Sequence, residues 1–172
     1  NHKEKKIFEN SITIIDTNER MKKEGELYEY NCKYFMNVAL SIALFTSNVN
    51  LNEDYSGKVF IYNRPLRIVD IDPKKTLNKS LEHLMERGIS GQFLTQKNIT
   101  DQLTKYKKCP KNVYIITNKI WEDVFEEFDD FEYEKPFKKK KQDPTKIYFW
   151  NLNSKGVYIK NVNKHVTYIE GS

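Results

Sequence analysis

The sequence predicts an α/β fold with a mostly parallel central sheet and helices on both faces. Three apolar runs without strand alternation, residues 11–16, 113–117 and 147–151, are typical of strands buried on both faces. Segments with helical periodicity separate them, which implies parallel crossovers of the Rossmann-like kind. Asp16, Asn118 and Asn151 end or directly follow these runs, at the carboxyl ends where such sheets place their sites.

Length and composition fit one globular domain. The 172 residues contain 38% hydrophobic and 31% charged residues, enough for a sizeable core. We assign residues 1–10 to a polar lead-in segment and residues 11–172 to a single domain. The chain begins at Asn1 rather than Met, as a processed product or a piece of a longer protein does.

The first half of the chain is expected to hold one long helix and a hairpin. Apolar residues recur at spacings of three and four over residues 28–48, which predicts a deeply buried helix. Short strands at 58–62 and 66–71 flank Asn-Arg-Pro at 63–65, a turn signal. Thr76 is placed to cap a further helix, which ends before Gly88.

The second half continues the alternation. The pattern predicts a helix over 93–107 closed by Pro110, and a helix over 120–133. We interpret residues 134–145, which contain four consecutive lysines, as a charged loop. Two short strands, 157–159 and 166–169, complete the sheet.

The two cysteines favour a reducing compartment. Cys32 and Cys109 are far apart and lack metal-ligand spacing, so a cytoplasmic or otherwise intracellular location is expected. The longest apolar run, residues 38–45, is too short to span a membrane.

The net charge of +5 comes almost entirely from lysine. With the many Asn and Tyr residues, this bias is typical of AT-rich coding, as in some large DNA viruses and protozoa.

Three segments resemble a known family. Residues 16–20 (Asp-Thr-Asn-Glu-Arg) resemble the Asp-x-Ser-x-Ser strand end of von Willebrand factor A-type (vWA) domains, with the aspartate kept and both serines replaced. Residues 57–63 (Gly-Lys-Val-Phe-Ile-Tyr-Asn) and 147–153 (Ile-Tyr-Phe-Trp-Asn-Leu-Asn) are similar to strands of one vWA branch. That branch holds the Ro/TROVE RNA-binding proteins and related uncharacterised proteins. The order of elements agrees over nearly the whole chain.

The resemblance implies a metal-site position that has degenerated. The family holds a divalent cation with an Asp and two hydroxyls from the first loop, a Thr from the second and an Asp from the third. One carboxylate remains and two cations, Arg20 and Lys119, have entered, so we expect no metal and no cofactor. The matching positions in this chain are Asp16, Asn18 and Arg20, then Gly91 or Ser90, then Asn118.

Two questions about this region remain open from sequence. Arg20 either replaces the metal by pairing with Asp16, or points into solvent while Asp16 caps the turn. The rim is either still a contact surface for a protein partner, now insensitive to chelators, or vestigial. If it is used, the expected partner-binding residues are Asp16, Asn18, Arg20, Ser90, Gln92, Asn118 and Lys119.

A lysine run is the candidate nucleic-acid site. Lys138, Lys139, Lys140 and Lys141 could bind phosphate. The competing interpretation is a solvated loop that pairs with the acidic residues just before it, and this interpretation is favoured. The three histidines have no ligand partners in the sequence and are taken as surface residues.

These features favour a non-catalytic role. An enzyme would need an acid/base cluster at the strand ends, where only Asp16 is available, and no phosphate loop or nucleophile motif is present. The sequence therefore predicts a metal-independent protein–protein interaction or scaffold domain of a larger assembly, without a membrane partner. The alternative is an RNA-associated module of a Ro-like ribonucleoprotein, which rests on fold analogy.

Overall fold

A computed structural model describes residues 8, 10–16, 21, 34–62, 66–72, 74–76, 79–80, 95–118, 128–152 and 157–171. In this part of the chain, one seven-stranded sheet has the strand order β3-β2-β1-β4-β5-β7-β6. The strands are β1 (Ser11–Ile15), β2 (Lys58–Ile61), β3 (Arg67–Asp70), β4 (Asn112–Thr117), β5 (Lys146–Asn151), β6 (Tyr158–Asn161) and β7 (Val166–Glu170).

The three apolar runs form the parallel centre of the sheet, as predicted. β1, β4 and β5 are neighbours, and Ile14 lies opposite Ile115, which in turn lies opposite Phe149. β2 and β7 extend the parallel section on its two sides. β3 and β6 add antiparallel edges. The turn predicted at residues 63–65 lies outside the described residues, but the antiparallel pairing of β2 with β3 agrees with a hairpin.

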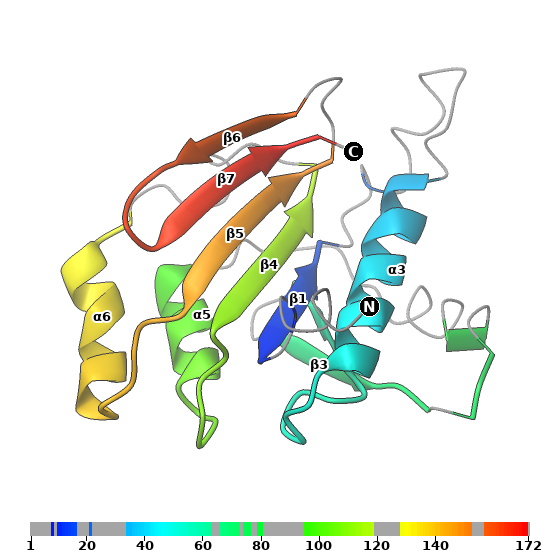
Figure 1. Ribbon diagram of the computed structural model, residues 1–172, viewed down its shortest axis with the longest axis horizontal. Coiled ribbons are helices and arrows are strands. Elements are labelled where there is room, and N and C mark those ends of the chain that lie inside the picture. The colour runs from blue at the N-terminus through cyan, green and yellow to red at the C-terminus, as the bar shows by residue number, and fades with distance from the viewer. Residues whose placement is uncertain are drawn as a thin grey trace.

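Helices cover both faces, which confirms the predicted fold class. Figure 1 shows α3 (Tyr34–Val49) on one face and α5 (Gln96–Leu103) and α6 (Asp130–Lys139) on the other. α5 is shorter than the predicted 93–107. Its N-cap is Thr95, whose hydroxyl accepts a hydrogen bond from the Asn98 amide at 3.2 Å, and residues 104–107 leave the helix.

Two apolar cores lie on opposite faces of the sheet. On the α5/α6 side, Ile14, Ile115 and Phe149 pack with Leu103 and Phe137, all of them fully buried. On the other side, α3 contributes one face to a core with β1, β2 and β4. The residues of that second core are Ile15, Met21, Met36, Ala39, Leu40, Ala43, Leu44, Val59, Ile61, Val69, Ile116 and Leu152.

The helix predicted at 120–133 and the loop predicted at 134–145 are each right in part: residues 130–133 are helical and residues 140–145 are not, but the helix begins later and ends later than predicted. Phe128 and Asp129 are not helical, and α6 runs to Lys139. The Asp129 carboxylate caps α6 by accepting from the Glu132 amide at 3.0 Å, and the fully buried Tyr133 and Phe137 lie one turn apart. Burial of this pair outweighs the hydrogen bond that Pro136 removes from the helix.

The connection between the parallel neighbours β5 and β7 differs from the usual one. A crossover between adjacent parallel strands is normally a helix that packs back on the sheet. Here β6 lies between β5 and β7 in the sequence and pairs with the far side of β7. α3 packs on β1 and β2, and none of α3, α5 and α6 covers the β4–β5–β7 section on the α3 side, where Phe8 lies against Tyr114 of β4.

Candidate functional site

The carboxyl ends of β1, β4 and β5 form a polar rim, which we define by Asp16, Thr117, Asn118 and Asn151. All four side chains are buried. Backbone hydrogen bonds keep the strand ends level: the Asp16 amide donates to the Ile116 carbonyl and the Leu152 amide to the Thr117 carbonyl, both at 2.9 Å. The predicted positions Asp16 and Asn118 are therefore brought to the same end of adjacent strands.

The Asp16 carboxylate accepts a hydrogen bond from a neighbouring strand. The Thr117 hydroxyl donates to Asp16 Oδ2 at 2.7 Å, between two residues that are 3% and 1% exposed. A hydrogen bond to an ionised acceptor is among the stronger ones in a protein. The rim thus supplies an internal donor to the carboxylate that the family resemblance assigns to a metal.

The donor chemistry of the rim fits a divalent cation poorly. Mg²⁺ and Ca²⁺ prefer several carboxylate and carbonyl oxygens. The described rim offers one carboxylate together with the amide side chains of Asn118 and Asn151. Among the described residues, no group of three His, Cys, Asp or Glu side chains is placed to hold a metal.

The rest of the predicted rim cannot be placed. Asn18, Arg20, Ser90, Gly91, Gln92 and Lys119 lie outside the described residues. Whether Arg20 pairs with Asp16 therefore stays a prediction, as does the use of these residues by a partner.

A hydrogen-bonded chain extends the rim toward β7. Asn151 Nδ2 donates to the Tyr168 hydroxyl at 3.0 Å, and that hydroxyl donates to Glu170 Oε1 at 2.7 Å. Sequence reasoning identified Asn151 but missed Tyr168 and Glu170. The register that sets Asn151 opposite Glu170 is a property of the sheet, and no local signal in the sequence predicts it.

The lysine run is partly used inside the fold. Lys138 pairs with Glu134 at 2.6 Å, and Lys140 Nζ donates to the Thr104 carbonyl at 2.8 Å and to the Tyr106 carbonyl. Lys139 and Lys141 are exposed. The favoured interpretation, pairing of this run with nearby acidic residues, agrees with the Lys138–Glu134 contact. The run lies at the end of helix α6, however, and not in a loop as predicted.

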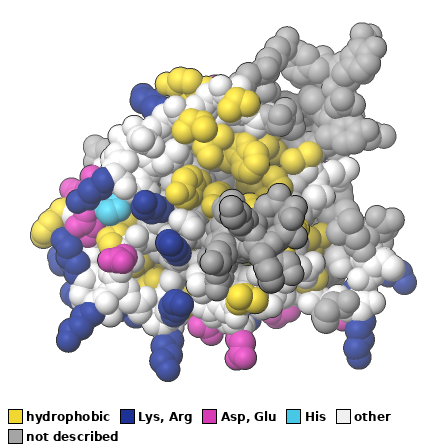
Figure 2. Space-filling view, in the orientation of Figure 1, with side chains coloured by type: hydrophobic (Ala, Val, Ile, Leu, Met, Phe, Trp, Pro, Cys, Tyr) yellow, Lys and Arg dark blue, Asp and Glu magenta, His cyan; other side chains and the backbone are white. Residues whose placement is uncertain are grey.

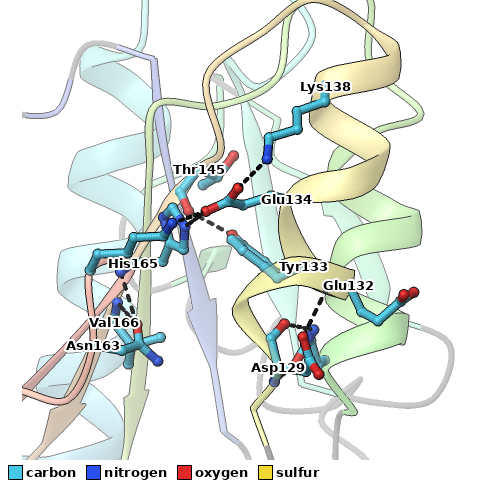
Figure 3. Close-up of polar contacts among 11 residues, drawn as sticks. Asp129, Glu132, Tyr133, Glu134, Lys138, Thr145, Asn163, His165 and Val166 are labelled. Atoms are coloured by element: carbon cyan, nitrogen blue, oxygen red, sulfur yellow. Dashed lines mark hydrogen bonds and ion pairs between the residues drawn. The ribbon is translucent and has the colours of Figure 1, made fainter.

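Glu134 joins α6 to the turn between β6 and β7. Its carboxylate meets Lys138, Lys164 and His165, the last at 2.8 Å, and Figure 3 shows it between Lys138 and His165. Hydrogen bonds from these three groups hold the pKa of Glu134 well below its usual range. We name these four residues the Glu134 cluster. The sequence left His165 as an unsupported surface histidine; its partner is 31 residues away.

The section of sheet that α3, α5 and α6 leave uncovered carries large apolar side chains, one of which, Tyr114, contacts Phe8 with ring centroids 5.5 Å apart. We define the open face as Tyr114, Tyr148, Trp150 and Ile169, all of them partly exposed. Tyr114 and Tyr148 stack with ring centroids 5.0 Å apart, and Trp150 lies opposite Ile169 in the register of β5 and β7. Figure 2 shows hydrophobic side chains gathered over this part of the sheet. Burial and the neighbouring Tyr148 raise the pKa of Tyr114 to about 12.

A shallow polar hollow borders the open face. It has a volume of about 560 Å³ and contains Tyr148 and Thr167 from the sheet face. Two of its other lining residues are lysines, one from β5 and one from the β6–β7 turn. The remaining lining residues are Lys146, Asn161, Asn163, Lys164 and His165.

Comparisons with known proteins support the fold. No protein-family model matches the sequence, and no curated protein matches it. Among solved structures, the chain is similar to the Ro (RSR) protein of Deinococcus radiodurans, with a TM-score of 0.66 and 11% identity over 92% of this chain. The match spans 30% of the length of that protein. At this identity the likeness establishes the fold, which is compatible with the expected vWA/Rossmann-like class.

Within the described residues, no helix has the length and apolar character needed to cross a lipid bilayer.

Proposed function

We propose that this chain is a non-catalytic, metal-independent protein-interaction domain of the vWA type that works within a larger assembly. The observation that carries the proposal is the open face. A parallel sheet is normally covered on both sides, and contiguous apolar surface on a soluble domain marks a contact site. Tyr and Trp, which make up three of its four residues, are enriched where proteins bind one another.

The carboxyl rim supports the metal-independent part of the proposal. Hard divalent cations prefer several carboxylate and carbonyl oxygens, whereas the described rim offers Asp16 as its one carboxylate, beside the amide side chains of Asn118 and Asn151. We assign the open face as the main contact surface. The rim residues around Arg20 form a second candidate surface, where a guanidinium could receive an acidic side chain of the partner.

Partner capture from the native source tests this function. The bait is the full chain, with one arm in EDTA and one arm treated with nuclease. Tyr148→Lys should remove partners that bind the open face, while Arg20→Glu tests the rim. Phe131→Lys is a matched control, because Phe131 is an aromatic residue that is 67% exposed on α6, away from both surfaces.

The outcomes separate the possibilities. We expect capture that survives EDTA and nuclease, is lost with Tyr148→Lys and is kept with Phe131→Lys. Equal capture by all variants would overturn the assignment of the open face. Capture lost in EDTA would overturn metal independence. Unchanged capture by Arg20→Glu would show that the rim is vestigial.

One observation favours the RNA-associated alternative. Stacked aromatic residues on a sheet, flanked by lysines, can serve as a platform for unpaired bases. Tyr114 and Tyr148 stack in this way, with Lys146 and Lys164 around the adjoining hollow. Capture that disappears with nuclease would favour this reading. Direct binding of single-stranded RNA, weakened by Tyr148→Ala but not by Phe131→Ala, would then promote it above the protein-interaction proposal.

A further inference from the structure

β6 is the outermost strand of the sheet, and its side chains are exposed. Among the described strands it pairs only with β7, on one side. Val157, Tyr158 and Ile159 are 82%, 52% and 63% exposed, and Lys160 and Asn161 are exposed as well. Three consecutive exposed apolar residues at the start of an edge strand are unusual, because unpaired edges invite pairing with another chain. We call residues 157–161 the β6 edge.

The ladder with β7 determines which backbone groups of the β6 edge point outward. The Val162 amide donates to the Val166 carbonyl at 2.9 Å, so Val162 faces β7. In an antiparallel strand, the amide and carbonyl of one residue point to the same side, and successive residues alternate. Lys160 and Tyr158 therefore also face β7, while the backbone groups of Asn161, Ile159 and Val157 face away from the sheet.

We propose that the β6 edge pairs antiparallel with the β6 edge of a second copy of this chain, with Ile159 opposite Ile159. In this register the outward groups meet as three hydrogen-bonded residue pairs: Ile159 with Ile159, and Val157 with Asn161 in both directions. Each such pair exchanges two hydrogen bonds, so the contact supplies about six. The arrangement is a closed two-fold dimer with one continuous sheet.

Lys160 favours this register over the two registers whose two-fold axis lies at an adjacent residue. A shift of the two-fold axis to Lys160 would place the two lysines directly opposite each other, and like charges in that position are destabilising. A shift to Tyr158 would place the two tyrosines directly opposite each other and separate each Lys160 from the Tyr158 ring of the other copy. With the axis at Ile159, each Lys160 lies opposite Tyr158 of the other copy, where a cation–aromatic contact is favourable.

Charges and apolar side chains continue across the proposed junction. Tyr158 lies opposite Glu170 within each sheet, so the row across the interface reads Glu170, Tyr158, Lys160 of the second copy. One strand, which carries Tyr158, therefore separates the lysine from a carboxylate of opposite charge. On the other face, Ile159 lies opposite Ile169, and the two Ile159 side chains join the apolar rows of both copies.

The solution mass tests the dimer. A short edge buries less than the roughly 1,200 Å² of standard interfaces, so we expect a weak dimer whose mass rises toward twice that of the chain as concentration increases. Ile159→Pro should keep the chain monomeric. Proline removes only the outward amide there, and it is tolerated on an edge whose N–H faces solvent. Circular dichroism and thermal unfolding check that this variant is folded.

Charge reversal gives an independent variant. Lys160→Glu removes the two Lys160–Tyr158 contacts between the copies and should weaken dimerisation about tenfold. Lys139→Glu is the matched control, because Lys139 is an exposed lysine in the last turn of α6. A chain that stays monomeric at all concentrations overturns the proposal. So does a dimer that persists in Ile159→Pro, or the formation of open filaments.

Cysteine trapping tests the register. Ile159→Cys should form a cross-linked dimer under mild oxidation, because residues of a hydrogen-bonded pair have Cα atoms about 5.5 Å apart, within disulfide range. Tyr158→Cys should not form a cross-link, because the Tyr158 residues of the two copies do not lie opposite each other in this register. The reverse result would overturn the register. The proposal stands apart from the function proposed above, since Ile159→Pro tests the dimer and Tyr148→Lys tests partner capture.

Discussion

Replacing Thr117 by valine isolates the hydrogen bond that the rim supplies to Asp16. The two side chains are nearly the same shape, so the substitution removes the 2.7 Å bond to Asp16 Oδ2 with little change in packing. Hydrogen bonds to charged groups contribute about 1.5–3 kcal/mol. We therefore expect Thr117→Val to lower the free energy of unfolding by that amount. For a domain of this size the loss corresponds to about 2–4 °C in Tm for each kcal/mol.

Thr145→Val is the matched control for this measurement. Thr145 is also fully buried, and its hydroxyl donates at 2.6 Å to a neutral acceptor, the Pro110 carbonyl. A neutral bond is worth about 0.5–1.5 kcal/mol, so urea unfolding should show the smaller loss for this variant.

A double-mutant cycle with Asp16→Asn attributes the effect to the pair. In the Asp16→Asn background, Thr117→Val should cost less than in the native chain, because the acceptor is no longer charged. The reasoning is refuted if Thr117→Val costs no more than Thr145→Val, or if its cost is the same in both Asp16 backgrounds.

Three further predictions concern the rim, the Glu134 cluster and the lysine run. Calorimetry with Mg²⁺, Mn²⁺ or Ca²⁺ should show no micromolar binding; binding that Asp16→Ala abolishes would contradict the degenerate site. Glu134→Gln should destabilise the fold at neutral pH. Because the folded-state pKa of Glu134 is lowered, the difference from the native chain should be full above its ordinary value of 4.5 and shrink as the pH falls below it, as acid titration of unfolding would show. Any phosphate binding by the lysine run should fall steeply with salt and weaken in Lys139→Glu with Lys141→Glu, whereas nanomolar RNA binding at physiological salt would contradict the ranking of the two functions.

The central strands could be predicted because their signal is local. Ile14, Ile115 and Phe149 lie in short apolar runs, and a strand buried on both faces produces such a run whatever its neighbours are. The same argument placed Asp16, Asn118 and Asn151 at one edge of the sheet.

The extent of α6 was mispredicted because local signals conflict there. Pro136 and the lysines favour a loop, while the buried Tyr133 and Phe137 favour a helix. The second signal prevails only because α5 and the sheet provide a core to pack against.

No local sequence pattern predicts the contacts between residues that are far apart in the chain. The bond from Thr117 to Asp16 joins residues 101 positions apart, and the cluster of Glu134 with His165 depends on where the β6–β7 turn falls. The open face escaped prediction for the same reason. It results from β6 occupying the connection between two parallel neighbours, where a helix is usual. Both strands after residue 157 were predicted, but the order in which they join the sheet was not.

The connection from β5 through β6 to β7 also affects how the sheet unfolds. β6 and β7 are consecutive in the sequence, pair with each other, and join the sheet through β5. The Glu134 cluster is a second attachment, between their turn and α6. Such a unit can detach as one cooperative piece while β1, β4 and β5 keep their own ladders. Amide protons of β7 bonded to β5 would then exchange with solvent at one common rate, faster than those of β1. Acid that weakens the Glu134 cluster would favour this partial opening before the central strands respond.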